Sequence, residues 1–150
     1  MAVSFVSFDE RFLEASWRWL QDEELCKLIN TTTPSKEQQQ IWFNQLPYKT
    51  DYQIWGVEYN SIPVGVSGIK HIQVRSGEYW GYIGEKAYWG KGIGKEMLLL
   101  AEQKAKMLDL QQLKLHVLAE NIRAVKLYQN AGYKIVSADD SFQLMQKKIA

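Results

Sequence analysis

The sequence predicts an α+β fold in which a mixed, mostly antiparallel sheet carries helices on both faces. Three observations support this fold class. Segments with strand-like alternation and segments with helical spacing follow one another along the whole chain of 150 residues. A strand, a helix and a second strand span residues 78–118, and a crossover of this kind joins parallel strands. No repeat, low-complexity tract or linker divides the sequence, so we expect a single domain over residues 1–150.

Composition limits the functions that such a domain can have. The formal net charge is +1, which disfavours a protein that coats nucleic acid or an anionic membrane. No apolar run is long enough to span a bilayer, and the first residues do not resemble a signal peptide. The lone cysteine, Cys26, cannot form an internal disulfide, and we expect it to be a buried apolar residue. We therefore expect a cytoplasmic protein that has neither nucleic acid nor a membrane as its partner.

The N-terminal third is expected to hold one strand followed by helices. Alternation of apolar and polar residues predicts a strand over residues 3–8. Asp9 can cap a helix whose apolar residues recur at near-helical spacing, and residues 22–29 can continue that helix after a kink. A capping-box pattern, Ser35 with Gln38 three residues later, then starts a further helix.

A three-stranded meander is expected in the middle of the chain. Residues 52–59 and 62–73 flank the turn signal Asn60-Ser61, which predicts a hairpin. Arg75-Ser76-Gly77 predicts a second turn, and residues 78–83 form the third strand. From Gly92 onward the apolar spacing becomes helical. The remaining expected elements are a strand over residues 113–118, a helix over 121–131 that ends at Gly132, and two closing strands over 133–137 and 142–147.

Three glycines, Gly90, Gly92 and Gly94, alternate where the third strand of the meander gives way to a helix. Glycine lets the backbone turn sharply and approach a ligand closely, and the first N–H groups of a helix favour a phosphate. Two known phosphate loops do not fit. A Walker loop needs Ser or Thr after Gly-Lys, and Glu96 stands there. The dinucleotide pattern Gly-x-Gly-x-x-Gly, begun at Gly90, has Lys95 at its last position.

Two segments resemble motifs of the GNAT acetyltransferase superfamily. Trp89-Gly90-Lys91-Gly92-Ile93-Gly94 is similar to the superfamily's loop Arg/Gln-x-x-Gly-x-Gly/Ala, except that Trp89 replaces Arg or Gln. The segment from Asn121 to Tyr133 is similar to the second motif, Asn-x-x-Ala-x-x-Leu-Tyr-x-x-x-Gly-Phe, except that Tyr133 replaces Phe. The two motifs stand in the right order and spacing, and the resemblance covers the chain from about residue 52 to its end.

The resemblance implies acetyl-CoA as the co-substrate and no metal. In this superfamily the central parallel strands splay apart and the cofactor fills the gap between them. The loop binds pyrophosphate mainly through backbone N–H groups, and Asn121 hydrogen-bonds the pantetheine arm. The residues that the resemblance implies in cofactor binding are Tyr82, Ile83, Gly84, Trp89, Gly90, Lys91, Gly92, Ile93, Gly94, Lys95, Asn121 and Tyr128.

The implied chemistry is direct attack of an amine on the acetyl group, with no enzyme nucleophile. By the resemblance, Tyr128 places its hydroxyl near the sulfur, and a phenol with a pKa near about 10 is protonated at neutral pH, so Tyr128 is the candidate acid. The residue that acts as the general base has more than one candidate. His116 is one candidate because an imidazole can take a proton near neutral pH. Glu78 is its rival, Glu85 and His71 are weaker candidates, and a chain of waters could also serve.

In this superfamily the N-terminal half shapes the acceptor pocket, and here that half is rich in aromatic residues. They are Trp17, Trp19, Trp42, Phe43, Tyr48, Tyr52 and Trp55. We expect most of them in the core, Trp17 and Trp42 included, and a few to be free to stack on a sugar or a nucleobase.

Three segments resemble the branch of ribosomal-protein N-terminal acetyltransferases and nucleotide-linked amino-sugar N-acetyltransferases: Trp17-Arg18-Trp19-Leu20, Asp22-Glu23 and the loop variant Tyr88-Trp89-Gly90. The acceptor is therefore expected to be a small-molecule amine, with a nucleotide-linked amino sugar favoured. A protein N-terminus is an alternative, and so is a polyamine, although a net charge near zero disfavours the latter. A further alternative is a non-catalytic acetyl-CoA-binding module, which the presence of Tyr128 disfavours. Formation of a homodimer is left open.

Overall fold

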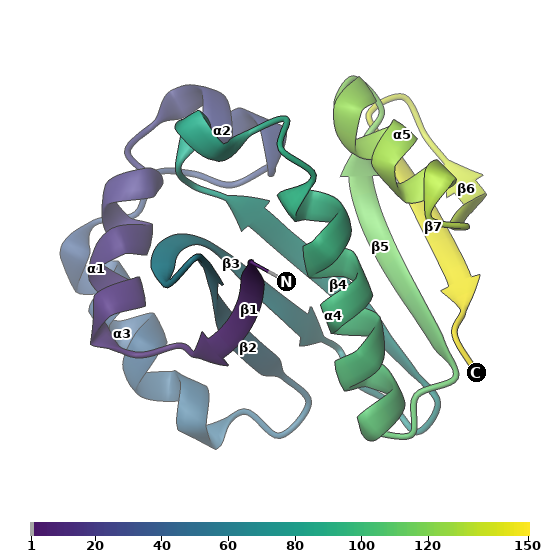
Figure 1. Ribbon diagram of the computed structural model, residues 1–150, viewed down its shortest axis with the longest axis horizontal. Helices are drawn as coiled ribbons and strands as arrows, with labels where there is room; N and C mark the ends of the chain where they lie inside the picture. The colour runs from purple at the N-terminus through teal and green to yellow at the C-terminus, as the bar shows by residue number, and fades with distance from the viewer. Residues whose placement is uncertain (1) are drawn as a thin grey trace.

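Seven strands form one sheet in the computed structural model, which describes residues 2–150. Their order across the sheet is β1-β2-β3-β4-β5-β7-β6 (Figure 1). The strands are β1 (Val3–Ser7), β2 (Gln53–Tyr59), β3 (Ile62–Lys70), β4 (Ser76–Ile83), β5 (Gln112–Leu118), β6 (Lys134–Ala138) and β7 (Phe142–Lys148). The helices are α1 (Glu10–Trp19), α2 (Glu23–Leu28), α3 (Lys36–Gln45), α4 (Ile93–Met107) and α5 (Ile122–Asn130), with short 3-10 helices η1 (Leu46–Tyr48) and η2 (Lys86–Tyr88). The predicted α+β class is confirmed, and so is the order of elements with one exception: residues 22–29 do not continue the first helix after a kink, because α2 is a separate helix.

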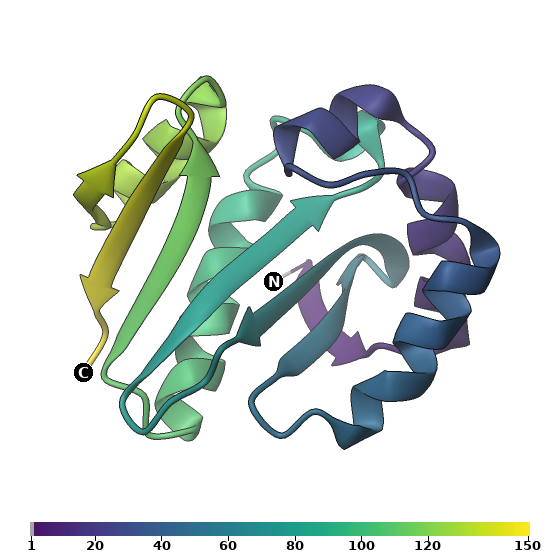
Figure 2. The ribbon, with the colours of Figure 1, turned by 180° about the vertical axis from the view of Figure 1, so that it is seen from behind.

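Helices lie on both faces of the sheet. α4 crosses the face seen in Figure 1, with α5 beside it. In Figure 2, α2 lies in front of the end of the sheet, and α3 lies at the side of the sheet next to α1. Successive residues of β4 point to opposite faces. Tyr79 packs in a core cluster with Leu98 of α4, whereas Trp80 packs against a cluster that contains Trp19 of α1 and Leu25 of α2. We call these two sides the α4 face and the α1 face.

Side-chain caps start the first three helices, and the sequence predicts two of them, at Asp9 and Ser35. Asp9, Asp22 and Ser35 each accept a hydrogen bond from a backbone N–H of the first helical turn. The Gln38 side chain accepts a bond from the Ser35 N–H in return, which completes the predicted capping box. Cys26 is buried on α2, as expected.

The turn predicted over Arg75-Ser76-Gly77 is wrong in its position. β3 ends at Lys70, and β4 already begins at Ser76. The chain reverses at a bend over Val74 and Arg75, which is closed by the Gln73 N–H donating to the carbonyl oxygen of Ser76 at 2.8 Å. His71, directly after β3, has a left-handed backbone with φ of +51°. Gly77 serves packing inside the strand, because an added Cβ would lie 2.6 Å from a methyl carbon of Ile69. A glycine that packs closely and one that turns look alike in the sequence.

The parallel pair β4 and β5 separates along its length. Pairing joins only the first three residues of each strand, Ser76–Glu78 with 112–114, and the other neighbouring strands are antiparallel. Beyond Glu78 the two strands diverge, as Figures 1 and 2 both show. The backbone groups that face this divergence have no partner strand, so the sheet holds an open gap at its centre.

Candidate active site

The glycine loop lies at the N-terminus of α4. Gly90 and Gly92 have φ of +77° and +82°, and a Cβ added at either would meet no protein atom within 4 Å. Both glycines are therefore required by backbone conformation, and the space beside them is free for a ligand. Within residues 2–150, no protein group accepts a hydrogen bond from the N–H groups of residues 90–95. These donors, the helix dipole and the exposed Lys91 and Lys95 suit a pyrophosphate.

Trp89, the first departure from the superfamily's loop, closes the loop onto the end of β4. Its indole N–H donates to the carbonyl oxygen of Ile83 at 2.8 Å. The Lys86 ammonium lies 5.6 Å from the ring centroid and also pairs with Asp22 and Glu24 of the α2 region, at 2.8 and 2.6 Å. The tryptophan thus fixes the position of the loop, a role that the sequence pattern does not reveal.

The end of β4 offers backbone groups to the gap at alternate residues. The N–H of Gly84 bonds to the carbonyl oxygen of Val64 on the β3 side at 2.8 Å, so only its carbonyl could reach a cofactor. The alternation of an antiparallel ladder turns the backbone groups of Tyr82 toward β3 as well, and those of Gly81 and Ile83 toward β5. Gly81 was missed in the sequence because only the register assigns it to the gap.

Gly84 has a packing role of its own. An added Cβ would lie 2.1 Å from a ring carbon of Trp19. The Trp19 indole donates to Glu85 at 2.7 Å, and Arg18 pairs with the same carboxylate oxygen at 3.0 Å. Glu85, a weaker candidate base, therefore ties α1 to the segment that leads into the glycine loop.

Asn121 and Tyr128 border the gap from α5. Asn121 caps this helix through its side-chain oxygen, which accepts from the Ala124 N–H at 3.3 Å, and its amide N–H groups remain available as donors. Tyr128 packs edge-on against Tyr79 and Tyr133, with ring centroids 6.3 and 6.1 Å apart. Burial raises the pKa of the Tyr128 hydroxyl to about 12, so the group keeps its proton through the neutral range.

Tyr133, the second departure from the superfamily's motifs, has a partner for its extra hydroxyl. The hydroxyl donates to the buried Glu102 carboxylate at 3.2 Å, and the Lys147 ammonium binds the same carboxylate at 3.0 Å. A phenylalanine would leave Glu102 with one hydrogen bond fewer in a buried setting. The Tyr133 hydroxyl thus stabilises the fold and has no role in the chemistry at the gap.

Glu78 and His116 are direct neighbours at the point where β4 and β5 separate. Nδ1 of His116 lies 3.1 Å from Oε2 of Glu78, and Nδ1 of His71 lies 3.2 Å from Oε1. Partial burial alone would raise the pKa of the Glu78 carboxyl, but hydrogen bonds from His116 and His71 and the charge of Lys70 outweigh it and hold that pKa below its usual value. The two residues that the sequence offered as rival bases therefore form one hydrogen-bonded unit.

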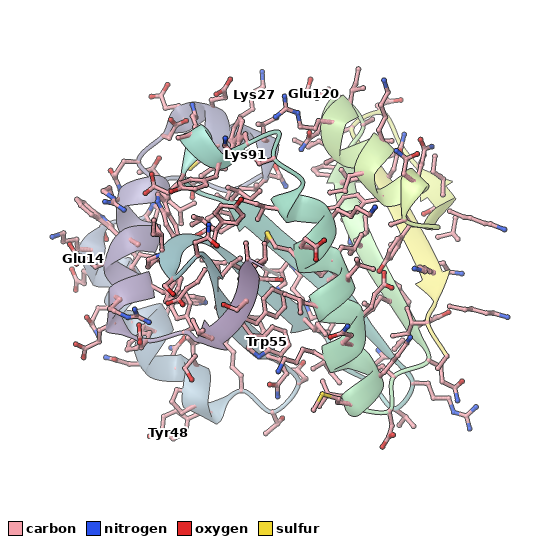
Figure 3. The ribbon with its side chains drawn as sticks, in the orientation of Figure 1. Glu14, Lys27, Tyr48, Trp55, Lys91 and Glu120 are labelled. Atoms are coloured by element: carbon pink, nitrogen blue, oxygen red, sulfur yellow. The ribbon has the colours of Figure 1, made fainter. Side chains whose placement is uncertain are left out.

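A cavity of about 1120 Å³ joins these groups. Its walls include Gly92 and Tyr128 on the α4 face and Glu78, His116 and Trp80 on the α1 face, so it passes through the gap. Lys91 of the loop and Glu120, just after β5, lie at the same end of the molecule, where the two strands are farthest apart (Figure 3). The arrangement can hold one substrate on each face with their reacting groups meeting between the strands.

The aromatic residues of the N-terminal half divide between the cavity, the core and the surface. Tyr52 and Trp42 line the cavity. Trp17 and Trp42 are only half-buried and belong to none of the three core clusters of the described residues, so they are not the core residues that their helical faces predict. Trp19 is buried, and Tyr48 is 85% exposed and points outward (Figure 3). Trp17 lies under the Lys36 ammonium. Phe43 and Trp55 line a separate hollow near β1.

Trp80 lines the cavity, although the expectations from the sequence do not include this. Its indole lies against Gly68, where an added Cβ would meet the ring at 2.5 Å, and the Tyr52 ring lies beside it with centroids 6.1 Å apart. The alternation Glu78, Trp80, Tyr82 along β4 carried the signal that could have found it.

No group of three or more His, Cys, Asp or Glu side chains in residues 2–150 could hold a metal ion. In the same part of the chain, no helix is long and apolar enough to cross a membrane.

Comparisons with known proteins agree on the fold. The model of the acetyltransferase (GNAT) family matches residues 15–133. An uncharacterized protein of Methanocaldococcus jannaschii is 28% identical over 99 residues, which is 65% of this chain and 20% of that protein. The matched segments span only 20–30% of the length of the curated relatives.

Two solved structures cover nearly the whole chain. The N-acetyltransferase PseH of Campylobacter jejuni superposes with a TM-score of 0.77 at 19% identity, over 100% of both chains. The spermidine N-acetyltransferase of Vibrio cholerae, solved with CoA and spermine, gives a TM-score of 0.89 at 17% identity, over 98% of this chain and 95% of that one.

Proposed function

The chain belongs to the acetyltransferase (GNAT) family, and on this premise we propose that it transfers an acetyl group from acetyl-CoA to a primary amine. One observation carries the proposal. A single cavity runs through the gap between β4 and β5 and joins the glycine loop, Tyr128 and the Glu78–His116 pair. Donor and acceptor would enter from opposite faces of the sheet, and the thioester and the amine would meet between the strands.

The donor fits the α4 face. The N–H groups after Gly90 and the ammonium of Lys95 suit the pyrophosphate, and the backbone groups of Gly81 and the N–H of Ile83 suit the amides of the pantetheine arm. In this reading Asn121 donates to the same arm. An oxyanion that forms from the acetyl carbonyl would need a donor at the gap, and the unpaired backbone N–H groups of β4 can provide it.

Two side chains would accept and donate the protons of the reaction. Glu78 is ionised at neutral pH because its pKa is lowered, and an ionised carboxylate only accepts hydrogen bonds, so Nδ1 of His116 must carry the hydrogen. Nε2 of a neutral His116 then keeps its lone pair. As the amine nitrogen bonds to the acetyl carbon, Nε2 takes the amine's proton, the C–S bond breaks, and the Tyr128 hydroxyl gives its proton to the leaving sulfur.

The acceptor that these walls favour is an amino sugar, either free or nucleotide-linked. Trp80 and Tyr52 form an aromatic wall on the α1 face, and uncharged polar side chains complete that part of the cavity. They are Asn30, Thr31, Gln38 and Gln39. Aromatic faces with amides and hydroxyls suit a sugar ring, which is apolar on one face and hydroxylated at its edge.

A polyamine is less well matched. Its several ammonium groups need several carboxylates, whereas the cavity walls within residues 2–150 hold two, Glu78 and Glu120. The first of these already binds His116, His71 and Lys70. The likeness to the spermidine acetyltransferase of Vibrio cholerae therefore supports the fold of this chain and does not favour a polyamine as its acceptor.

Release of the coenzyme A thiol with a panel of amines tests the proposal. The panel contains free and nucleotide-linked amino sugars, N-terminal peptides and polyamines, and we expect turnover with the first group. His116→Ala should abolish most of the turnover and leave acetyl-CoA affinity unchanged, and Lys114→Ala on the same strand face is its control. Tight acetyl-CoA binding without turnover of any amine would instead indicate a binding module.

A further inference from the structure

His71 contacts the acid–base unit from outside the cavity. It follows β3 directly, its side chain is 68% exposed, and it does not line the cavity, so it cannot touch either substrate there. Its Nδ1 nevertheless lies 3.2 Å from Oε1 of Glu78, the oxygen that does not bond to His116. The backbone of His71 is left-handed, with φ of +51°, a conformation that non-glycine residues rarely adopt.

Each oxygen of the Glu78 carboxylate has its own imidazole. The Glu78 side chain is 16% exposed, and both ring nitrogens must donate because an ionised carboxylate only accepts. Two bonds to different oxygens fix the rotation of the carboxylate plane, which one bond would leave free. The orientation of this plane in turn sets the direction in which Oε2 accepts the hydrogen bond from Nδ1 of His116.

Two other charged groups face Glu78. The ammonium of Lys70, from β3, lies 3.7 Å from Oε2, the same oxygen that binds His116. Lys114, on β5, is the register partner of Glu78 and has no ion pair with it. A lysine is a point charge on a flexible stem, so it lowers the energy of the anion without fixing its plane. Among these neighbours, only His71 holds Oε1.

We propose that His71 is a positioning residue of the active site: by donating to Oε1 of Glu78 it fixes the carboxylate, holds the hydrogen of His116 on Nδ1, and leaves Nε2 to take the proton of the amine. This inference rests on the proposed function, since it assigns His116 as the proton acceptor. It adds a second histidine that acts through Glu78 and meets no substrate.

The tautomers of the two rings test this directly. The chain has only two histidines, so long-range ¹H–¹⁵N spectra of labelled protein resolve both rings without ambiguity. At about pH 8.5, where a free imidazole is neutral, we expect both rings to carry hydrogen on Nδ1. His71→Gly removes the side chain and accepts the left-handed backbone, and it should turn His116 into a mixture of tautomers. His71→Asn keeps an N–H donor and tolerates positive φ, and it should restore the Nδ1–H form.

Three results would overturn the inference: an Nε2–H tautomer on either ring of the unaltered protein, an unchanged His116 in His71→Gly, or an equally mixed His116 in His71→Asn. The first needs no variant, so a folding failure cannot hide it. The spectra involve neither acetyl-CoA nor an amine. A negative result in the spectra therefore does not contradict the proposed transfer reaction. Conversely, an amine panel without turnover would not contradict the hydrogen bonds among His71, Glu78 and His116, but it would show that they do not serve catalysis.

Discussion

On the α4 face of the gap the site consists mainly of backbone, whereas on the α1 face it consists of side chains. The α4 face presents the free N–H groups after Gly90 and the unpaired edge of β4. The α1 face presents the Glu78–His116 pair and the wall formed by Trp80 and Tyr52. The two faces meet at the cavity, but their geometry depends on different features of the sequence.

This difference has a physical basis. A backbone site needs a chain reversal, a helix start and glycines at positive φ, and these are local features with short sequence patterns. A side-chain site depends on which residues of distant segments share a face. Trp80 and Tyr52 come from opposite sides of two hairpin turns, and only the strand register brings them together. Substitutions on the α4 face should therefore affect the binding of the acetyl donor, and substitutions on the α1 face the binding of the acceptor.

The largest effect is expected at the one α4-face side chain placed in the chemistry. Tyr128→Phe should lower kcat by about 100-fold because it removes the proton for the leaving sulfur. The dissociation constant of acetyl-CoA, measured by calorimetry, should stay within about two-fold, since a phenyl ring fills the same space. An unchanged kcat would remove Tyr128 as the acid.

Tyr133→Phe is the matched control for Tyr128→Phe. The two rings touch, with centroids 6.1 Å apart, but the Tyr133 hydroxyl donates to buried Glu102 and not to the cavity. The control should keep its kcat and lose about 1 kcal/mol of unfolding free energy in urea. A fall in kcat for both variants would mean that packing, and not the acid, explains the first.

The glycine loop should show the next largest effect. Gly92→Val places a β-branched residue at φ of +82° and should weaken acetyl-CoA binding by about 30-fold, the size of a lost hydrogen bond to a charged group. Gly132→Val creates the same kind of strain at φ of +98° away from the cavity, so it serves as the control. Equal affinities of the two variants for acetyl-CoA would contradict a phosphate role for the loop.

The sequence predicts these two faces unequally. The fold class, the parallel pair, the caps at Asp9 and Ser35 and the order of elements other than the separate helix α2 follow from periodicity and local hydrogen bonding, and the structure confirms them. The turn expected at residues 75–77 lies over residues 74–75 instead, because glycine signals both a turn and close packing and Gly77 already belongs to β4. The roles of individual site residues stay predictions.

What the sequence could not predict depends on tertiary contacts. It treats Glu78 and His116 as rivals because they lie 38 positions apart, and only the register of β4 and β5 makes them partners. It shows Trp89 only as a departure from the superfamily's loop, because the carbonyl of Ile83 becomes its partner only after the loop folds back.

On the α1 face, Trp80 should control the acceptor and not the donor. Trp80→Leu removes an aromatic surface beside Glu78 and should raise the KM of the amine found by the panel by about five-fold, with acetyl-CoA affinity unchanged. Trp55→Leu is the control, because Trp55 stacks on Phe5 in the separate hollow near β1. A change in acetyl-CoA affinity, without one in the KM of the amine, would show that the two faces are not divided as described.

The smallest effect concerns stability and not transfer. Because the pKa of Glu78 is lower in the folded protein than its ordinary value of 4.5, the carboxylate stabilises the fold above that pH, and the contribution is lost as the pH falls through the folded pKa. Glu78→Gln cannot titrate, so its melting temperature should fall less than that of the unaltered protein between pH 6 and the acid range below about 4.5. Equal falls would mean that His71, His116 and Lys70 do not stabilise the anion. The α1 face would then lack the fixed carboxylate that distinguishes it from the backbone-built α4 face.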